Sequence, residues 1–289
     1  MAKMIIMRGL PASGKSTRAK ELMAKEGNMV RINKDLLRTM LHFDKFTGPN
    51  EGKTRDAART LAKLFLTGAN GGTNVIIDDT NLNEGTMQSW KDLAKECGAK
   101  IQHENVETPY HECLKRDAER EDRVGAHVIT GMALQYGMYP VPEKSVVLCD
   151  LDGTLCDIKH RLPFVKGEKK DWKSFFAGIP QDKAREDVLE MVQGYASKGH
   201  QIFFVSARPD TYREQTAKWL FENYTAPYSA LIMRSSRDTR DDELIKGEMF
   251  DKFFSKFKIE AVIDDRPRVI RMWKERGLNV IDVGEGVEF

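Results

Sequence analysis

The chain has 289 residues, enough for one large domain or two ordinary ones, and its 31% charged and 40% hydrophobic residues are typical of a folded globular protein. It has no apolar run long enough for a membrane span or a signal-peptide core, and its four cysteines show no metal-binding spacing, so we expect a cytoplasmic protein with no membrane partner and no zinc site. The formal net charge of only +2 gives no overall sign of a nucleic-acid binder, so any basic surface must be local.

Short apolar segments that end in polar or acidic residues recur along the chain. Their Val, Ile, Leu and Phe content predicts buried parallel strands, which we place at residues 4–9, 74–81, 145–152, 201–208 and 260–267. Helical spacing of apolar residues fills the intervals, at residues 15–25, 55–69, 84–97, 109–122, 127–137, 183–198, 211–223, 241–255 and 266–276. This alternation predicts an α/β fold whose chemistry lies beyond the carboxyl ends of the strands.

The segment MYPVPEK, residues 138–144, contains two prolines and neither a helical nor a strand pattern. It separates two series of alternating strands and helices. We therefore expect two domains, over residues 1–140 and 145–289.

The segment GLPASGKST, residues 9–17, matches the pattern G-x-x-x-x-G-K-[ST] between a predicted strand and a predicted helix. Backbone N–H groups of such a loop, together with the helix N-terminus, bind the phosphates of a nucleoside triphosphate. Lys15 can reach the β- and γ-phosphates, and Ser16 can bind Mg²⁺. The alternative is a glycine-rich turn with a surface lysine, which the strand-loop-helix context disfavours. The predicted ATP-binding residues are Gly9, Ser13, Gly14, Lys15, Ser16 and Thr17.

A phosphate donor needs an acceptor site, and Asp35 and Arg38 follow the probable second strand. A carboxylate there can accept the proton of an attacking hydroxyl, and Arg38 can bind an anionic acceptor. The alternative is an N-cap aspartate with a solvated arginine. Asp78 and Asp79 end another predicted strand, and we expect one of them to orient Lys15, Ser16 or the acceptor. The alternative at this strand end is a helix cap by Thr80 or Asn81.

Arg116 and Arg120 lie four residues apart on the helix predicted over 109–122. Two arginines on one helix face can close over the triphosphate and stabilise the charge that develops during transfer. The alternative is a solvated face on which the arginines pair with neighbouring acids, namely Asp117, Glu119 and Glu121.

The segment DLDGT, residues 150–154, ends an apolar strand with two carboxylates that point to the same side. One carboxylate can attack phosphorus and form an acyl-phosphate, while the other protonates the leaving oxygen and then activates water. A Mg²⁺ ion would offset the repulsion between carboxylate and phosphate. Other strand ends and a downstream helix supply candidate partners for the metal, the phosphate oxygens and the acyl-phosphate, namely Asp264, Asp265, Ser206 and Lys246.

This ordered set resembles the haloacid dehalogenase phosphatase superfamily, and with the N-terminal loop the whole chain resembles the bacteriophage polynucleotide kinase-phosphatase family. The resemblance implies a P-loop kinase with a parallel sheet, followed by a Rossmann-like phosphatase with a small cap insertion. It implies transfer of the ATP γ-phosphate to a 5′-OH end and removal of 3′-phosphate, with Mg²⁺ as metal. Its implied partners are DNA or RNA ends and a nucleic-acid ligase, with homo-oligomers possible and the host-cell cytoplasm as location if the gene is a phage gene.

The resemblance also implies residue roles. In the kinase, Asp35 is the general base, and Lys15, Ser16, Arg38, Asp79, Arg116 and Arg120 match its active-site residues, with Thr80 and Asn81 beside the acceptor. In the phosphatase, the matched residues are Asp150, Asp152, Ser206, Arg208, Arg240, Lys246, Asp264 and Asp265. The implied metal ligands are Ser16, Asp150, Asp152, Asp264 and Asp265.

The cap insertion, residues 159–180, mixes four aromatic residues with several lysines. Such a mixture can stack bases and attract phosphates. The alternative is inward packing, which we expect for two or three of the aromatics, Phe164, Trp172, Phe175 and Phe176.

Two other functions fit the sequence less well. A small-molecule kinase fused to a nucleotidase keeps both chemistries, and the low net charge favours it slightly. A nucleic-acid end-binding scaffold with inactive sites is disfavoured, because every expected catalytic position is filled.

Overall fold

The computed structural model describes residues 1–68 and 72–285. The chain divides into two compact units, Met1–Met138 and Tyr139–Phe289. Residue 69, the last of the helix expected over 55–69, lies outside the described residues, as do residues 286–289 of the expected second domain. Across the described part of the chain, no helix combines the length and apolarity needed to cross a membrane.

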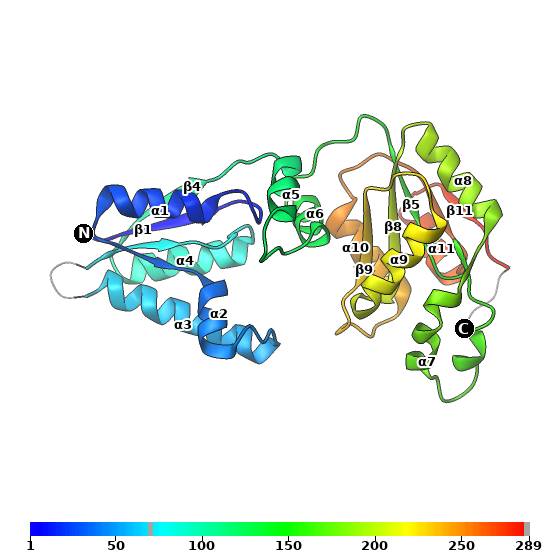
Figure 1. Ribbon diagram of the computed structural model, residues 1–289, viewed down its shortest axis with the longest axis horizontal. Coiled ribbons are helices and arrows are strands. Elements are labelled where there is room, and N and C mark those ends of the chain that lie inside the picture. Colours follow the sequence, from blue (N-terminus) through cyan, green and yellow to red (C-terminus); the bar gives the residue numbers. More distant parts are fainter. Residues whose placement is uncertain (69–71, 286–289) are drawn as a thin grey trace. The chain divides into compact units, whose positions relative to one another are not determined.

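The first unit is built on a four-stranded parallel sheet in the order β2-β3-β1-β4 (Figure 1). The strands are β1 Lys3–Arg8, β2 Met29–Ile32, β3 Asn74–Ile77 and β4 Lys100–Asn105. The helices are α1 Lys15–Glu26, α2 Lys34–His42, α3 Gly48–Leu66, α4 Glu84–Glu96, α5 Tyr110–Ala118 and α6 Ala126–Gln135.

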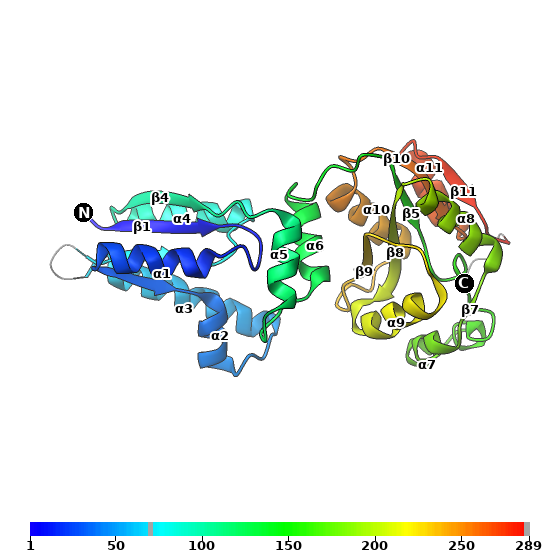
Figure 2. The ribbon, with the colours of Figure 1, turned by 45° about the horizontal axis from the view of Figure 1, so that its top comes forward.

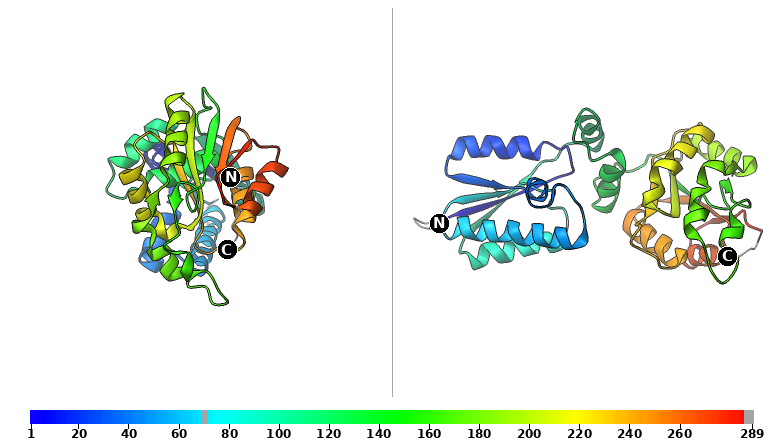
Figure 3. Two further views of the ribbon diagram at one scale, coloured as in Figure 1. Left: turned by 90° about the vertical axis from the view of Figure 1, so that its right-hand side faces the viewer. Right: turned by 60° about the horizontal axis from the view of Figure 1, so that its bottom comes forward.

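Alternating side chains of β1 explain how this sheet is covered on both faces. Ile5 and Met7 pack with α1, whereas Met4 and Ile6 pack with α3 and α4. Figure 3 shows α1 on one side of the sheet and the two longer helices on the other. Because both faces are buried, the middle residues of the central strands β1 and β3 are all apolar, as the sequence predicts.

The second unit has a five-stranded parallel sheet in the order β11-β10-β5-β8-β9 (Figure 2). The strands are β5 Val146–Cys149, β8 Gln201–Pro209, β9 Ala230–Arg234, β10 Ile259–Asp264 and β11 Val280–Asp282. Its main helices are α8 Glu186–Ser197, α9 Arg213–Asn223, α10 Asp242–Phe253 and α11 Pro267–Glu275. The fold class expected from the sequence, two α/β units with parallel sheets, is confirmed.

The cap insertion lies between two short antiparallel strands, β6 Cys156–Asp157 and β7 Lys183–Ala184. It holds the helix α7 Trp172–Ala177 and two turns of 3-10 helix, η1 Leu162–Phe164 and η2 Ile179–Gln181; a third such turn, η3 Asp210–Tyr212, follows β8. Because Lys183 and Ala184 form the strand that pairs with β6, α8 starts at Glu186 and not at the expected residue 183.

Several expected boundaries are wrong for identifiable reasons. The helix α3 begins at Gly48, before the expected residue 55, because Thr47 accepts a hydrogen bond from the Asn50 N–H and a proline occupies the first turn. The helix α5 ends at Ala118, so Arg120 lies beyond the helix that was expected to carry it. The strand β4, KIQHEN, was not among the predicted strands because it is an edge strand with mostly polar side chains.

Candidate active sites

The loop between β1 and α1 is built for close backbone approach. A Cβ at Gly9 would lie 2.7 Å from the Val106 carbonyl oxygen, and Gly14 caps α1 at a φ of +97°. Lys15 is buried, and its Nζ donates a hydrogen bond to the Leu10 carbonyl at 2.6 Å. Burial lowers the pKa of Lys15, although Asp78 opposes this shift. The lysine therefore lies along the loop, while Ser16 and Thr17 are exposed at the start of α1.

The two acids that follow β3 contact cationic partners. Asp78 accepts a hydrogen bond from Arg31 Nε at 2.6 Å, and Arg31 Nη2 lies 3.4 Å from Ser16 Oγ. Asp79 accepts from the Lys34 N–H at 3.0 Å, and burial raises the pKa of Asp79. Asp78 is therefore linked through Arg31 to Ser16, directly after the phosphate-binding loop, and Asp79 contacts the start of α2.

Thr80 and Asn81 hold backbone in place and do not cap a helix. The Thr80 carbonyl accepts from the Gly9 N–H at 3.1 Å. Asn81 has a φ of +44°, and its side-chain amide donates to the Met7 carbonyl at 2.8 Å. The cap of α4 is Asn83, so the helix-cap alternative for Thr80 and Asn81 is wrong.

Asp35 lies in the first turn of α2, and the cap of that helix is Asn33, whose Oδ1 accepts from the Leu36 N–H at 2.9 Å. The N-cap alternative for Asp35 is therefore wrong. Its side chain is 81% exposed and accepts from Arg38 Nη1 at 2.7 Å. An exposed carboxylate held by one arginine can receive a proton from an incoming hydroxyl.

Arg38 has a second partner that the sequence did not reveal. Glu51, in the first turn of α3, accepts from Arg38 Nε at 2.5 Å and from Nη2 at 2.9 Å. The hydrogen bonds that Arg38 donates to Glu51 raise the pKa of Arg38, and Asp35 adds to the shift. The contact depends on packing of α2 against α3, so no local pattern points to Glu51.

The two arginines that were predicted to close over the triphosphate have different contacts. Arg116 Nη1 lies 3.4 Å from the Ser13 carbonyl of the loop, and its Nε donates to Glu112 at 2.8 Å. Arg120 pairs with Asp122 through two hydrogen bonds of 2.9 and 2.6 Å. The structure thus places Arg116 over the phosphate-binding loop, whereas the expected shared helix face with Arg120 is wrong because α5 ends first.

In the second unit, a lysine joins two carboxylates at neighbouring strand ends. Lys246 Nζ lies 2.9 Å from Asp150 Oδ1 and 2.8 Å from Asp264 Oδ2, and all three residues are buried. Burial, followed by Asp264 and Asp265, raises the pKa of Asp150, and Lys246 opposes the shift. Asp265 accepts from Thr154 Oγ1 at 2.9 Å, and burial raises its pKa to about 6.

Three of these carboxylates could hold a divalent metal ion. Ligand atoms of Asp150, Asp264 and Asp265 lie within 4.8 Å of one another. Carboxylate oxygens are the donors that Mg²⁺ prefers, so the donor set fits the metal. Gly153 permits this approach, since a Cβ there would lie 2.1 Å from Asp265 Oδ2.

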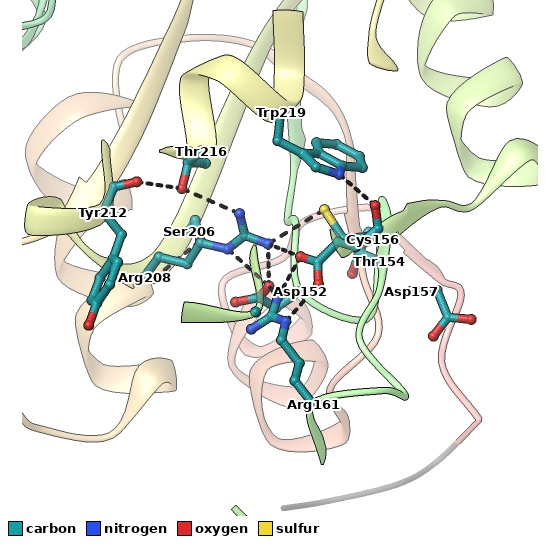
Figure 4. Close-up of polar contacts among 12 residues, drawn as sticks. Asp152, Thr154, Cys156, Asp157, Arg161, Ser206, Arg208, Tyr212, Thr216 and Trp219 are labelled. Carbon is teal, nitrogen blue, oxygen red and sulfur yellow. Dashed lines mark hydrogen bonds and ion pairs between the residues drawn. The ribbon is translucent and has the colours of Figure 1, made fainter. Parts of the chain in front are cut away.

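The carboxylate of Asp152 lies outside that group, so the structure does not bring this predicted metal ligand together with the other three. Figure 4 shows it turned toward Arg161 and Arg208. Arg208 Nε donates to Asp152 at 2.9 Å, and Arg161 Nη2 contacts the same oxygen. Although burial acts in the opposite direction, the two guanidinium groups hold the pKa of Asp152 below its usual range.

Asp182 completes this buried cluster, which we call the arginine-aspartate quartet (Asp152, Arg161, Asp182 and Arg208). Asp182 accepts from Arg161 Nε at 2.7 Å and from Arg208 Nη2 at 2.8 Å. Arg161 and Asp182 belong to the cap insertion and its border, where no motif marks them, and sequence reasoning missed both.

The remaining predicted residues lie on or near one cleft of about 590 Å³. Ser206 is buried within β8, three residues before its end, and its Oγ accepts from the Arg208 N–H at 3.2 Å. Arg240 lines the cleft, but its guanidinium is paired with Asp238 and Glu248. Arg234 also lines the cleft, and its buried Nε has no hydrogen-bond partner among the described residues. The sequence analysis did not single out Arg234.

These folds and sites define a P-loop phosphoryl-transfer unit followed by a phosphatase unit of the haloacid dehalogenase type. The second unit, residues 144–288, matches the family model of the polynucleotide kinase PNKP phosphatase domain, and residues 4–137 match an AAA domain. The first of these models covers half of the chain, and the chain belongs to that polynucleotide kinase-phosphatase family. The resemblance drawn from the sequence is thereby confirmed. The two domain types imply use of ATP and of a divalent metal ion.

Individual proteins and solved structures are similar to part or most of this chain. A protein of Autographa californica nuclear polyhedrosis virus named "Putative bifunctional polynucleotide kinase/RNA ligase" is 29% identical over 299 residues, covering 94% of this chain but 41% of its own length. An L-seryl-tRNA(Sec) kinase of Methanococcus maripaludis is 32% identical over 133 residues, covering 45% of this chain and 50% of its own. A chain in the solved Pnkp1/Rnl/Hen1 RNA repair complex is 28% identical, with coverage of 99% and 97% and a TM-score of 0.44. The chain thus spans about two fifths of the length of its viral relative.

Proposed function

We propose that the chain is a bifunctional nucleic-acid end-healing enzyme, which transfers the ATP γ-phosphate to a 5′-OH end and hydrolyses a 3′-phosphate end. The observation that carries this proposal is the pairing of two opposed sites in one chain. One is a phosphate-binding loop near an exposed Asp35, and the other is a buried Asp150 held by Lys246. Family membership supports the nucleic-acid substrate.

In the kinase unit, the loop amides and Lys15 bind the β- and γ-phosphates of ATP. Asp35 accepts the proton of the 5′-hydroxyl as its oxygen attacks the γ-phosphorus. Arg38, oriented by Glu51, binds the phosphate next to that hydroxyl. Arg116 lies over the loop, where its charge stabilises the phosphoryl group in transfer.

In the phosphatase unit, a carboxylate oxygen of Asp150 attacks the phosphorus, and the bond from phosphorus to the 3′-oxygen breaks. Asp152 gives its proton to the departing 3′-oxygen, and later takes a proton from the water that releases inorganic phosphate and restores Asp150. Lys246 neutralises charge on Asp150 throughout. The two guanidinium groups that contact Asp152 must give up part of this contact before Asp152 can carry the proton.

The metal in this proposal is Mg²⁺, held by Asp150, Asp264 and Asp265. When bound, it offsets the repulsion between the nucleophile and the phosphate. In the kinase unit, Ser16 is the proposed ligand, because its hydroxyl is exposed directly after the phosphate-binding loop.

The proposed partners are DNA or RNA ends and a ligase that seals them, in the cytoplasm. The viral relative is named as a kinase and RNA ligase, which supports a link between end preparation and ligation. A homo-oligomer is compatible with the proposal but is not required by it.

One doubly labelled oligonucleotide tests the whole proposal. It carries a 5′-OH and a 3′-phosphate, and γ-labelled ATP reports the first reaction while phosphate release reports the second. Both labels should change in the presence of the wild-type chain. A small-molecule kinase fused to a nucleotidase would phosphorylate or hydrolyse a nucleoside 3′-monophosphate and leave the oligonucleotide unchanged, and an inactive scaffold would change neither.

A further inference from the structure

The phosphatase cleft has an aromatic wall that the proposed chemistry does not use. Trp172 and Phe176 of the cap insertion and Tyr212 after β8 line the same cleft as Asp150 and Lys246. The ring centroids of Trp172 and Phe176 are 5.9 Å apart at 22°, and those of Phe176 and Tyr212 are 5.0 Å apart at 32°. The three rings, which we call the aromatic wall, therefore form one contiguous group that lines the cleft, with the first pair stacked and the second pair tilted.

Core packing accounts for only part of this wall. Phe175 and Phe176 are buried, which confirms inward packing for two of the four aromatics of the insertion. Trp172 lines the cleft and remains 43% exposed, although a ring of that size gains much from burial. Lys170 Nζ lies 5.6 Å above its ring. An accessible indole beside a lysine, on a cleft wall, is typical of a site that stacks a planar ring and attracts a negatively charged group attached to that ring.

We propose that the aromatic wall binds the base of the nucleotide that carries the 3′-phosphate, while Lys170 and Lys173 attract the phosphodiester before it. This inference rests on the proposed phosphatase function and names the substrate group that the site grips. The 3′-phosphate and the base are attached to one sugar, and the cleft contains both Asp150 and Trp172. Its volume of about 590 Å³ lies within the range of pockets that enclose a nucleotide-sized ligand.

The test compares two 3′-phosphorylated oligonucleotides that differ only at the terminal nucleotide, one with a base and one abasic. Loss of one stacked base should raise the wild-type KM about 10- to 100-fold on the abasic substrate, with kcat nearly unchanged. Trp172→Ala should raise KM on the base-bearing substrate by a similar factor and leave the abasic substrate unaffected. Trp172→Phe should restore most of the loss.

Phe164→Ala is the matched control, because Phe164 belongs to the same insertion and is also 43% exposed but does not line the cleft. It should leave KM unchanged on both substrates. A second readout needs no turnover. Since Trp90, Trp219 and Trp273 are buried, a nucleoside 3′-monophosphate bound to Asp150→Asn should quench the fluorescence of Trp172, and the quenching should disappear in the double variant with Trp172→Phe.

The outcomes separate this inference from the function on which it rests. If the wild-type enzyme removes phosphate from both oligonucleotides with equal KM, or if Trp172→Ala loses the same factor on both, the base subsite is wrong and the phosphatase stands. If the folded wild-type enzyme acts on neither oligonucleotide, the phosphatase proposal is wrong, and the base subsite with it.

Discussion

At the scale of single residues, Asp35 presents an exposed carboxylate beside the guanidinium of Arg38. Asp35→Asn should lower the kinase kcat about 10²- to 10⁴-fold, because an amide cannot accept the proton of the hydroxyl. The KM for ATP should change little, since the phosphate-binding loop is untouched. Steady-state rates at varied ATP measure both constants, and near-normal kcat would show that Asp35 is not the base.

The contact between Arg38 and Glu51 leads to a separate prediction about how the kinase unit binds its acceptor. Arg38→Ala, and more mildly Glu51→Gln, should raise KM for an oligonucleotide acceptor, by about tenfold for the arginine, because a charge-assisted contact with its phosphate is lost. A bare nucleoside should be affected less. Glu96→Gln, which removes an exposed partner of Lys63, is the control. Equal fractional losses on both acceptors would exclude phosphate recognition by Arg38.

At the scale of elements, the cap insertion is tied to the catalytic strand by the arginine-aspartate quartet. Arg161→Ala would leave Asp152 and Asp182 buried with one arginine, and removal of one partner from a buried ionic cluster typically costs about 3–5 kcal/mol. We expect an earlier urea unfolding transition in the phosphatase unit and loss of its activity. Arg240→Ala should shift unfolding much less, because solvent screens the ion pairs of that half-exposed arginine. Equal shifts in the two variants would mean that the quartet contributes no special stability.

Elements and residues with local signals were predictable from the sequence. The apolar runs of β1, β3, β5, β8 and β10 predicted buried parallel strands. The loop before α1 predicted a phosphate-binding site, and the DLDGT turn predicted a phosphatase site. Glu51, Asp182 and Arg161 had no local signal, because their contacts arise from packing between segments far apart in the chain. The partners of Asp152 were missed for the same reason.

At the scale of the whole molecule, each unit has its own core and its own candidate site. Lys15→Ala should therefore abolish phosphorylation and leave phosphatase activity largely intact, and Asp150→Asn should do the reverse, because an amide cannot act as nucleophile. The doubly labelled oligonucleotide reports both activities of each variant. A folded variant that lost both activities would contradict two separate sites.

Metal removal should act on both units together. We expect EDTA to stop both reactions and Mg²⁺ to restore them. Burial raises the pKa of Asp265 to about 6, so protons compete with the metal below that pH, and the metal concentration for half-maximal phosphatase activity should rise as the pH falls through 6. Phosphatase turnover in complete chelation would rule out the proposed metal site.

The quartet also limits how caps can be exchanged between related enzymes. Arg161 and Asp182 lie at opposite ends of the inserted segment, while Asp152 lies in the turn after β5 and Arg208 belongs to β8. A transplanted cap that lacks either of the first two residues would bury an unpaired charge in its host. Chimaeras in this family should therefore succeed only when residues 161 and 182 are exchanged as a pair, and natural variation at one of them should be matched by variation at the other.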